Sequence, residues 1–442
     1  MMRIELRHVL ASSSLLLCLN ACSSDAAIPI GVLPAQGGAG AQGGSAPSAG
    51  AGGVVSAAGA AGMDGTPQGG TPAISGAGGT SGSSVGGPAA GGSSAGSAGS
   101  AGSTGIVISD PGTDGDGEFT IGPNYVADPA NLSAGAPVGH QISFVMSSAD
   151  SKLYPGINGK SYMRSVWVYI PAQYVPGSAA PYIVVQDGDY AVWFGDNLPH
   201  TPNHAAADLP ATANLPRILD NLIAANKLPK MVALIVDNGG GDAEGSERGL
   251  EYDTVSGKFA EYVISEVVPR VLTETKSQLQ IDLKLTDDPQ GHATLGGSSG
   301  GAASFSMAWW HPEYFSRVLT YSGTFVRQAS PEDPLYPHGC WSYHDYDPYN
   351  AAAPNGLIMK EATAKPLRVW LEDGQNDSGA GSGPASYRDF RLANERMAAS
   401  LKAKGYHYHQ DNAQGAGHFD GNVVAQTLPT ALQWLWRGYP LN

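Results

Sequence analysis

Short apolar runs follow one another from about residue 140 onward and predict strands. Each run holds four to nine residues, most are rich in Val, Ile, Leu and aromatic side chains, and several end at Gly, Pro or Asp. Runs of this length with such boundaries are typical of strands buried in a sheet. The predicted strands are 141–146, 162–170, 182–185, 232–236, 293–296, 318–321, 367–371 and 406–410.

Longer amphipathic stretches lie between these runs and predict helices. Their apolar residues recur at spacings of three and four, as on one face of a helix. The clearest cases are 215–223, 259–271, in which Pro269 predicts a kink, 302–310, 390–401 and 424–437. Strands that alternate with helices indicate βαβ units. We therefore predict an α/β fold, with a mostly parallel central sheet and helices on both faces.

Composition separates the first quarter of the chain from this pattern. Of the 60 glycines in the 442 residues, 25 lie in residues 36–105, where Asp64 is the single charged residue. Such a segment cannot bury enough apolar surface to offset its loss of entropy on ordering. We predict a signal peptide at 1–21, a disordered Gly/Ala/Ser-rich linker at 22–114 and one α/β domain at 115–442.

The first residues predict export and lipid attachment. Arg3 and Arg7 precede an apolar stretch that ends at Leu19-Asn20-Ala21-Cys22. A basic start, a short apolar segment and small residues before the cut describe a secretory signal peptide. The cysteine after Leu-x-Ala resembles a bacterial lipobox, which implies lipidation of Cys22 and a place in the cell envelope, by default the outer membrane. The alternative is a plain signal peptide and a secreted protein.

Charge and cysteine content narrow the function classes. The formal net charge is −15 and no long basic run occurs, which argues against a nucleic-acid partner and leaves the N-terminal lipid as the only membrane contact. Cys340 is the one cysteine outside the signal and lipobox, and we interpret it as a structural thiol. His338, Cys340 and His344 are spaced irregularly and lack a fourth ligand, so we predict neither a metal nor a cofactor.

A nucleophile motif follows the strand predicted at 293–296. Gly297-Ser298-Ser299-Gly300-Gly301 reads G-x-S-x-G around Ser299, and a helix is predicted directly after it. This strand–turn–helix context is typical of a nucleophile elbow. The same pattern fits Ser298 between Gly296 and Gly300, with the turn one residue earlier. We take Ser299 as the predicted nucleophile and Ser298 as the alternative.

A nucleophilic serine needs a base, and the base needs an orienting acid. In this fold the order along the chain is serine, acid, histidine. His418 lies in a glycine loop before the last helix and is the predicted base, ahead of His407, His409 and His311. The acid is expected on the loop after 367–371. Asp377 is preferred there, with Asp373 as alternative and Glu372 as a further candidate.

The oxyanion of the reaction needs two N–H donors. One is expected from the residue after the nucleophile, which is Gly300 if Ser299 reacts. The other is expected from the loop after the strand at 182–185. We predict Gly188 or Asp189 for it.

Several segments together resemble one family of esterases. The segments are 168–174, 185–188, 296–301, 371–377, 417–418 and 431–436, with Arg248 and Glu251-Tyr252 between them. The family includes enterochelin esterases, feruloyl and acetylxylan esterases, and esterase D. The resemblance covers about residues 140–440 and implies an α/β-hydrolase fold without a metal, with Ser299, Asp377 and His418 as the catalytic residues.

The resemblance implies a serine esterase that acts through an acyl-enzyme. The expected substrate is a polysaccharide-linked feruloyl or acetyl ester, or a siderophore trilactone. Segment 327–362 and the Gly/Ser-rich loop 378–386 depart from the family and are expected to shape the substrate pocket. Two other hypotheses stay open, namely an acyltransferase of the mycolyltransferase type with the same triad and a catalytically silent surface-binding protein.

Overall fold

A computed structural model describes residues 111–441, apart from 133, 189–192, 194–212, 241–245, 329–331 and 346–355. The signal peptide, Cys22 and nearly all of the linker predicted from the sequence lie outside these residues, as does Asp189. Within the described part of the chain, no helix is long and apolar enough to cross a membrane.

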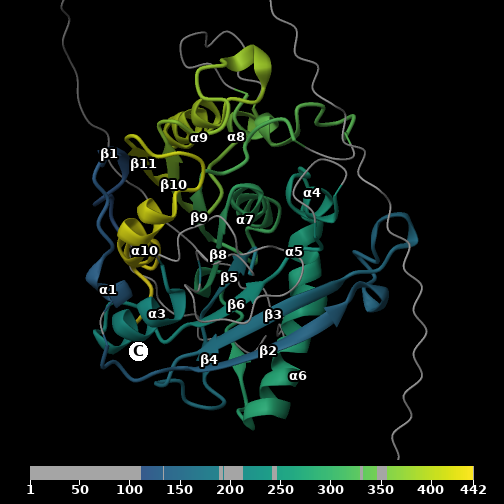
Figure 1. Ribbon diagram of the computed structural model, residues 1–442, viewed down its shortest axis with the longest axis vertical. Coiled ribbons are helices and arrows are strands. Elements are labelled where there is room, and N and C mark those ends of the chain that lie inside the picture. Colours follow the sequence, from purple (N-terminus) through teal and green to yellow (C-terminus); the bar gives the residue numbers. More distant parts are fainter. Residues whose placement is uncertain are drawn as a thin grey trace, which may run out of the picture. The chain divides into compact units, whose positions relative to one another are not determined.

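A nine-stranded sheet forms the centre of the domain (Figure 1). Its order is β1-β11-β10-β9-β8-β5-β6-β3-β2. The pairs β2–β3 and β3–β6 are antiparallel, so β3 runs against the direction of the other strands, and the remaining pairs are parallel. The strands are β1 (Gly117–Ile121), β2 (His140–Ser147), β3 (Met163–Ile170), β5 (Tyr182–Gln186), β6 (Val232–Val236), β8 (His292–Gly297), β9 (Arg317–Tyr321), β10 (Arg368–Gly374) and β11 (His407–Ala413). A separate parallel pair joins β4 (Ala179–Ala180) to β7 (Lys284–Leu285).

Helices cover both faces of this sheet, as predicted. One face packs against α1 (Pro129–Leu132), α3 (Leu215–Ala224) and α10 (Gly421–Leu435). The other packs against α4 (Glu247–Tyr252), α5 (Lys258–Tyr262), α6 (Val268–Leu279), α7 (Ser299–Trp310), α8 (Leu357–Lys360) and α9 (Phe390–Lys404). Successive side chains of β3 point to opposite faces of the sheet. Val166 and Val168 pack into the core beneath α7, and Trp167 and Tyr169 pack into the core on the other face, beneath α3.

The helix boundaries follow from local chemistry. Asp389 accepts the N–H of Leu392 and caps the start of α9, and Gly405, at φ +77°, ends that helix. The amphipathic stretch around Pro269 is divided into α5, a π-helical turn at Val263–Val267 and α6. At the predicted kink the structure has a π turn that ends two residues before Pro269, which lacks the N–H needed to continue the α-helical pattern.

Candidate active site

Ser298 occupies a sharp turn between β8 and α7. Its backbone has φ +56° and ψ −128°, outside the conformations that a serine ordinarily adopts. A Cβ added to Gly296 would lie 2.2 Å from the carbonyl oxygen of Gly300, so the chain can close this turn only with glycine at 296. The glycines two positions either side of Ser298 are thus the pair that the turn needs. This is the geometry of a nucleophile elbow.

This geometry makes the prediction of Ser299 as nucleophile wrong by one position. Ser299 is the first residue of α7 and is fully buried, whereas Ser298 is half-buried. The Oγ of Ser298 lies 2.8 Å from Nε2 of His418, and the Oγ of Ser299 lies 3.4 Å from Nε2 of Gln328. The helix α7 begins at Ser299, three residues before the predicted start at 302, so the turn that precedes it presents the hydroxyl of Ser298 instead of that of Ser299.

His418 lies between a hydroxyl and a carboxylate. Its Nδ1 is 2.6 Å from Oδ1 of Asp377, so the Nδ1–H donates to that carboxylate and leaves Nε2 to accept the hydroxyl of Ser298. The ring packs edge-on against Phe390 at 5.0 Å between centroids. The structure therefore brings the predicted histidine and acid together with the alternative serine.

Asp377 is held on the turn after β10. It is 3% exposed, and its Oδ1 accepts the N–H of Ser378 at 2.5 Å besides the imidazole. A carboxylate held in this way fixes the tautomer of the histidine and stabilises the imidazolium that forms when the serine loses its proton.

The acid and base loops touch each other through their backbones. A Cβ added to Gly374 would lie 2.3 Å from the carbonyl oxygen of Gly417. The N–H of Asn376 donates to the carbonyl of Ala416 at 2.8 Å. Because β10 and β11 are parallel neighbours, both loops leave the sheet at the same edge. This contact sets the distance between Asp377 and His418.

The predicted oxyanion donors also change. With Ser298 as the reacting residue, the following N–H belongs to Ser299 instead of Gly300, at the N-terminus of α7, where the helix dipole favours negative charge. The N–H of Gly188 donates to the carbonyl of Val236 at 3.2 Å, which makes it unsuitable. Asp189 lies outside the described residues and stays a prediction.

A buried ion pair stabilises the loop after β5. Asp187, at φ +55°, accepts Nε and Nη2 of Arg248, both at 2.8 Å, and Nδ2 of Asn238 at 2.7 Å. Its carboxylate lies beside Gly300, near the N-terminus of α7. An unpaired negative charge there would oppose an oxyanion, and Arg248 compensates it. The sequence pattern singled out Arg248 and Glu251 but gave no sign of Asp187 as a partner.

A second buried ion pair supports the first. Glu251 forms an ion pair with Arg164 on β3, and its carboxylate accepts a hydrogen bond of 2.7 Å from the hydroxyl of Tyr162. Glu251 and Arg248 lie on the same short helix, α4. Breaking a buried pair of this kind usually destabilises a protein because it leaves an uncompensated charge. The two pairs therefore tie α4 to the sheet beside the active site.

Asp253 is a buried carboxyl next to Ser299 that sequence reasoning missed. Its Oδ2 accepts Nε2 of Gln328 at 3.4 Å, and Gln328 also reaches Ser299. Burial raises the pKa of Asp253 to about 7, against the lowering effects of Arg248 and of hydrogen bonds from Ser299 and Gln328. No sequence motif marks this residue, because the contacts join three distant segments.

The titration of Asp253 predicts a pH-dependent change in stability. The folded pKa lies above that of the unfolded chain, so the native state keeps a proton that the unfolded state has lost, and stability falls as pH rises through this window. The variant Asp253→Asn lacks this loss. We expect the free energy of unfolding of the variant, relative to that of the parent, to rise by roughly 2–3 kcal/mol between about pH 5 and about pH 8.

Denaturant unfolding of parent and variant over this pH range measures the difference. Glu247 also has a pKa raised to about 7 by burial, and it titrates in both proteins alike, so its contribution cancels. The exposed residue Asp150 provides the matched control Asp150→Asn, for which we expect parallel curves. Parallel curves for Asp253→Asn would contradict the assignment.

Segment 327–345 and the loop after Asp377 lie against each other beside the active site. The N–H of Arg327 donates to the carbonyl of Tyr387 at 2.8 Å, and His338 stacks on Tyr387 with centroids 3.9 Å apart. Between them lies a cavity of about 190 Å³, and its lining includes Gln328. The rest of the lining is mostly polar, with Arg327, Glu332, Pro337, Gly339, Ser386 and Arg388.

The other candidate side chains have structural partners. His407 pairs with Asp116 at 2.8 Å, and His409 stacks on Trp370 at 3.5 Å. His311 pairs with Glu313 at 2.9 Å. Near segment 327–345, Nε2 of His344 lies 2.7 Å from the carbonyl oxygen of Phe325, and Sγ of Cys340 lies 3.7 Å from that of Asp253.

Neither alternative acid contacts His418. Asp373 accepts Nε2 of Gln410 at 2.7 Å, within a different cavity. Glu372 is fully buried on β10, and burial together with neighbouring carboxylates raises its pKa. Asp377 is therefore the candidate acid that the structure places against the histidine.

The sheet order, the elbow after β8 and the two layers of helices define an α/β-hydrolase fold, as predicted. The chain belongs to the esterase family described as "Putative esterase", which it matches over residues 161–435, more than half its length. This is a family of carboxylic ester hydrolases, so the class implied by the sequence resemblance is confirmed. A comparison with curated proteins found no significant match.

The solved structures that match this chain include esterases. An enterochelin esterase from Shigella flexneri is 19% identical, with a TM-score of 0.44, over 71% of this chain and 62% of that one. A ferulic acid esterase is 14% identical, with a TM-score of 0.45, over 68% and 100%. A feruloyl esterase module from Clostridium thermocellum is 17% identical, with a TM-score of 0.42, over 72% and 95%. The chain spans less than two thirds of the length of the enterochelin esterase.

Proposed function

We propose that this protein hydrolyses carboxylic esters through an acyl-enzyme on Ser298. The observation that carries the proposal is the continuous relay from Ser298 through His418 to Asp377, with distances of 2.8 and 2.6 Å. A hydroxyl, an imidazole and a buried carboxylate in this order can activate the oxygen as a nucleophile.

The reaction follows from these contacts. The Oγ of Ser298 attacks the ester carbonyl while Nε2 of His418 takes its proton. The N–H of Ser299 and a second donor, for which Asp189 remains the prediction, stabilise the tetrahedral oxyanion. The imidazolium then gives its proton to the departing alcohol. Water, deprotonated by the same Nε2, releases the acid from Ser298.

We propose a substrate with a polar part beside the ester, such as a feruloyl or acetyl ester on a polysaccharide, or a siderophore trilactone. The cavity beside Gln328 supports this class. A long hydrocarbon chain placed there would remove water from Arg327, Glu332 and Arg388 without offering them hydrogen bonds, and this is unfavourable. A lipid-anchored location through Cys22, with the Gly-rich linker as a tether, suits a large substrate outside the cell and belongs to the same proposal.

A substrate panel with the purified full-length protein tests this function. The panel pairs methyl ferulate, acetylated xylan and a catecholate trilactone with the fatty-acyl ester p-nitrophenyl palmitate. We expect turnover of at least one of the first three and little turnover of the palmitate. Transfer of the acyl group to an added sugar at the expense of hydrolysis would instead support the acyltransferase alternative. Failure of every ester together with failure to react with a fluorophosphonate probe would support the silent binding protein.

A further inference from the structure

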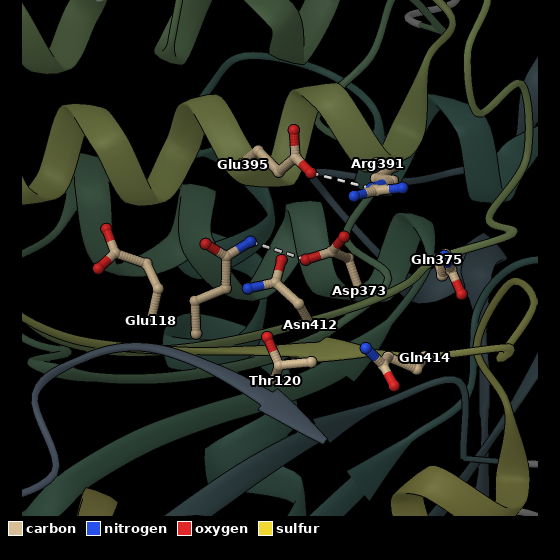
Figure 2. A pocket seen from close by; sticks show the side chains of 9 residues that line it. Glu118, Thr120, Asp373, Gln375, Arg391, Glu395, Asn412 and Gln414 are labelled. Carbon is tan, nitrogen blue, oxygen red and sulfur yellow. Dashed lines mark hydrogen bonds and ion pairs between the residues drawn. The ribbon is translucent and has the colours of Figure 1, made fainter. Parts of the chain in front are cut away.

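A second cavity lies between the sheet edge and helix α9, apart from the proposed relay. It has a volume of about 400 Å³, within the range of small-ligand pockets. Figure 2 shows Thr120, Asn412 and Asp373 on its strand side, and Arg391 and Glu395 on its helix side. Two residues of its strand wall, Glu118 and Thr120, come from β1, which precedes the residues matched by the esterase family.

The register of three strands explains why this cavity is polar. Thr120 pairs with Asn412, which pairs with Asp373 on the next strand, so their side chains form one row across the sheet. The preceding row holds Glu118 and Gln410. Strand residues beneath a helix are ordinarily apolar, because both elements must bury a hydrophobic face. Here the helix also turns polar residues to the sheet.

Most charges of the cavity are already compensated. Glu395 pairs with Arg391 at 2.9 Å, and Glu118 pairs with Lys402 at 3.2 Å. The remaining groups are side-chain amides, the hydroxyl of Thr120 and the carboxyl of Asp373. The described residues hold no cluster of three or more His, Cys, Asp or Glu side chains suited to a metal ion. The lining therefore favours a neutral ligand with many hydrogen-bonding groups.

Asp373 is the group that points to a ligand. It is 1% exposed, and its Oδ1 accepts Nε2 of Gln410 at 2.7 Å. Its Oδ2 is buried and has no hydrogen-bond partner among the described residues. A buried polar atom without a partner destabilises the protein. A ligand that forms a hydrogen bond with Oδ2 of Asp373 would remove this cost, and its binding would be favoured accordingly. Burial also raises the pKa of Asp373, and a protonated carboxyl can donate as well as accept.

The cavity shares its walls with the catalytic loops. Oε1 of Gln375, two residues before Asp377, accepts the N–H of Gly415 at 2.9 Å, three residues before His418. At the start of α9, Phe390 contacts the ring of His418 while the next residue, Arg391, lines the cavity. A ligand here would contact the backbone segments that position the acid and the base.

We propose that this cavity binds a sugar unit. Each hydroxyl of a sugar both donates and accepts, and a lining of amides, a hydroxyl and one carboxyl matches that chemistry. An acyl chain would find no apolar lining. A cation would meet Glu395 and Glu118, which Arg391 and Lys402 already neutralise, and Asp373, whose raised pKa favours the neutral acid. The assignment goes beyond ester hydrolysis, since binding at Asp373 requires no reaction at Ser298.

Calorimetric titration of the full-length Ser298→Ala protein tests the proposal without turnover. The probes are xylotetraose, D-xylose, L-arabinose, D-glucose and D-galactose at millimolar concentrations, with putrescine as a cationic probe. We expect at least one saccharide to bind at one site per chain. The substitutions Asp373→Asn and Thr120→Val, each added to this protein, should weaken that binding by about tenfold or more. Thr120→Val removes a hydroxyl from the cavity, and Asp373→Asn replaces the unpartnered oxygen Oδ2 by an amide that can only donate.

Thr120 is exposed on the edge strand β1 and valine has a similar shape, so we expect Thr120→Val to fold. It therefore tests the proposal if Asp373→Asn does not fold. Asp150→Asn, outside the cavity, should bind the saccharide like the parent. Three results would each overturn the proposal: no saccharide binds, putrescine binds while the sugars do not, or binding persists undiminished in the cavity variant that folds. Ester turnover by the parent protein in the same preparation reports separately on the proposed hydrolysis.

Discussion

Replacing Ser298 by alanine should lower kcat/KM for p-nitrophenyl acetate by roughly 10⁴-fold or more. The substitution removes the hydroxyl that lies 2.8 Å from His418 and leaves the elbow with a side chain of similar size. Residual activity should come only from the N–H donors and from substrate binding, which in serine hydrolases act without the nucleophile.

The neighbouring variant Ser299→Ala distinguishes the two assignments for the nucleophile. It removes a buried hydroxyl that contacts Gln328 but keeps the backbone N–H proposed to bind the oxyanion. We expect a loss of at most about tenfold, from the changed environment of Asp253 and Gln328. Initial rates with p-nitrophenyl acetate, alongside thermal unfolding of both variants, provide the measurement. A large loss in Ser299→Ala together with activity in Ser298→Ala would restore the prediction made from the sequence.

Replacing Asp377 by alanine should lower kcat/KM by roughly 10⁴-fold. The side chain is the hydrogen-bond acceptor of His418, so its loss removes both the orientation of the ring and the charge that stabilises the imidazolium. The measurement is a Michaelis–Menten comparison, with thermal unfolding to show that the variant is folded.

The variant Asp377→Asn separates these two contributions. A single oxygen of Asp377 accepts both the imidazole and the N–H of Ser378. An asparagine can place its carbonyl oxygen there and keep the tautomer of His418 while the charge is lost. We therefore expect Asp377→Asn to retain more activity than Asp377→Ala. Equal activity of Asp377→Ala and the parent would exclude Asp377 as the acid.

The core strands and the long helices were predictable because their apolar patterns are long and regular. The runs at 182–185 and 232–236 correspond to β5 and β6. Both strands are buried on both faces, so these runs are apolar throughout and stand out in the sequence. Strand β1 was not predicted. Its polar residues Glu118 and Thr120 alternate with Phe119 and Ile121, but the strand is short and lies at the sheet edge, without a continuous apolar run like those of the core strands.

The order of serine, acid and histidine along the chain was enough to select His418 and Asp377 as candidates. The choice between Ser298 and Ser299 was not decidable in this way, because Gly296-Gly297-Ser298-Ser299-Gly300-Gly301 fits the motif in two registers. The deciding contact, between Gly296 and the carbonyl of Gly300, is a property of the folded turn. Asp187 and Asp253 were missed because their partners are distant in sequence.

Both outermost strands of the sheet, β1 and β2, come from residues that precede the family match at 161–435. They occupy the hydrogen-bonding edges of β11 and β3, which would otherwise present unpaired N–H and C=O groups. Exposed edges of this kind promote association between chains. The residues before the family segment thus keep β11 and β3 in the interior of the sheet, and a shortened protein that retains all nine strands has to begin before Gly117.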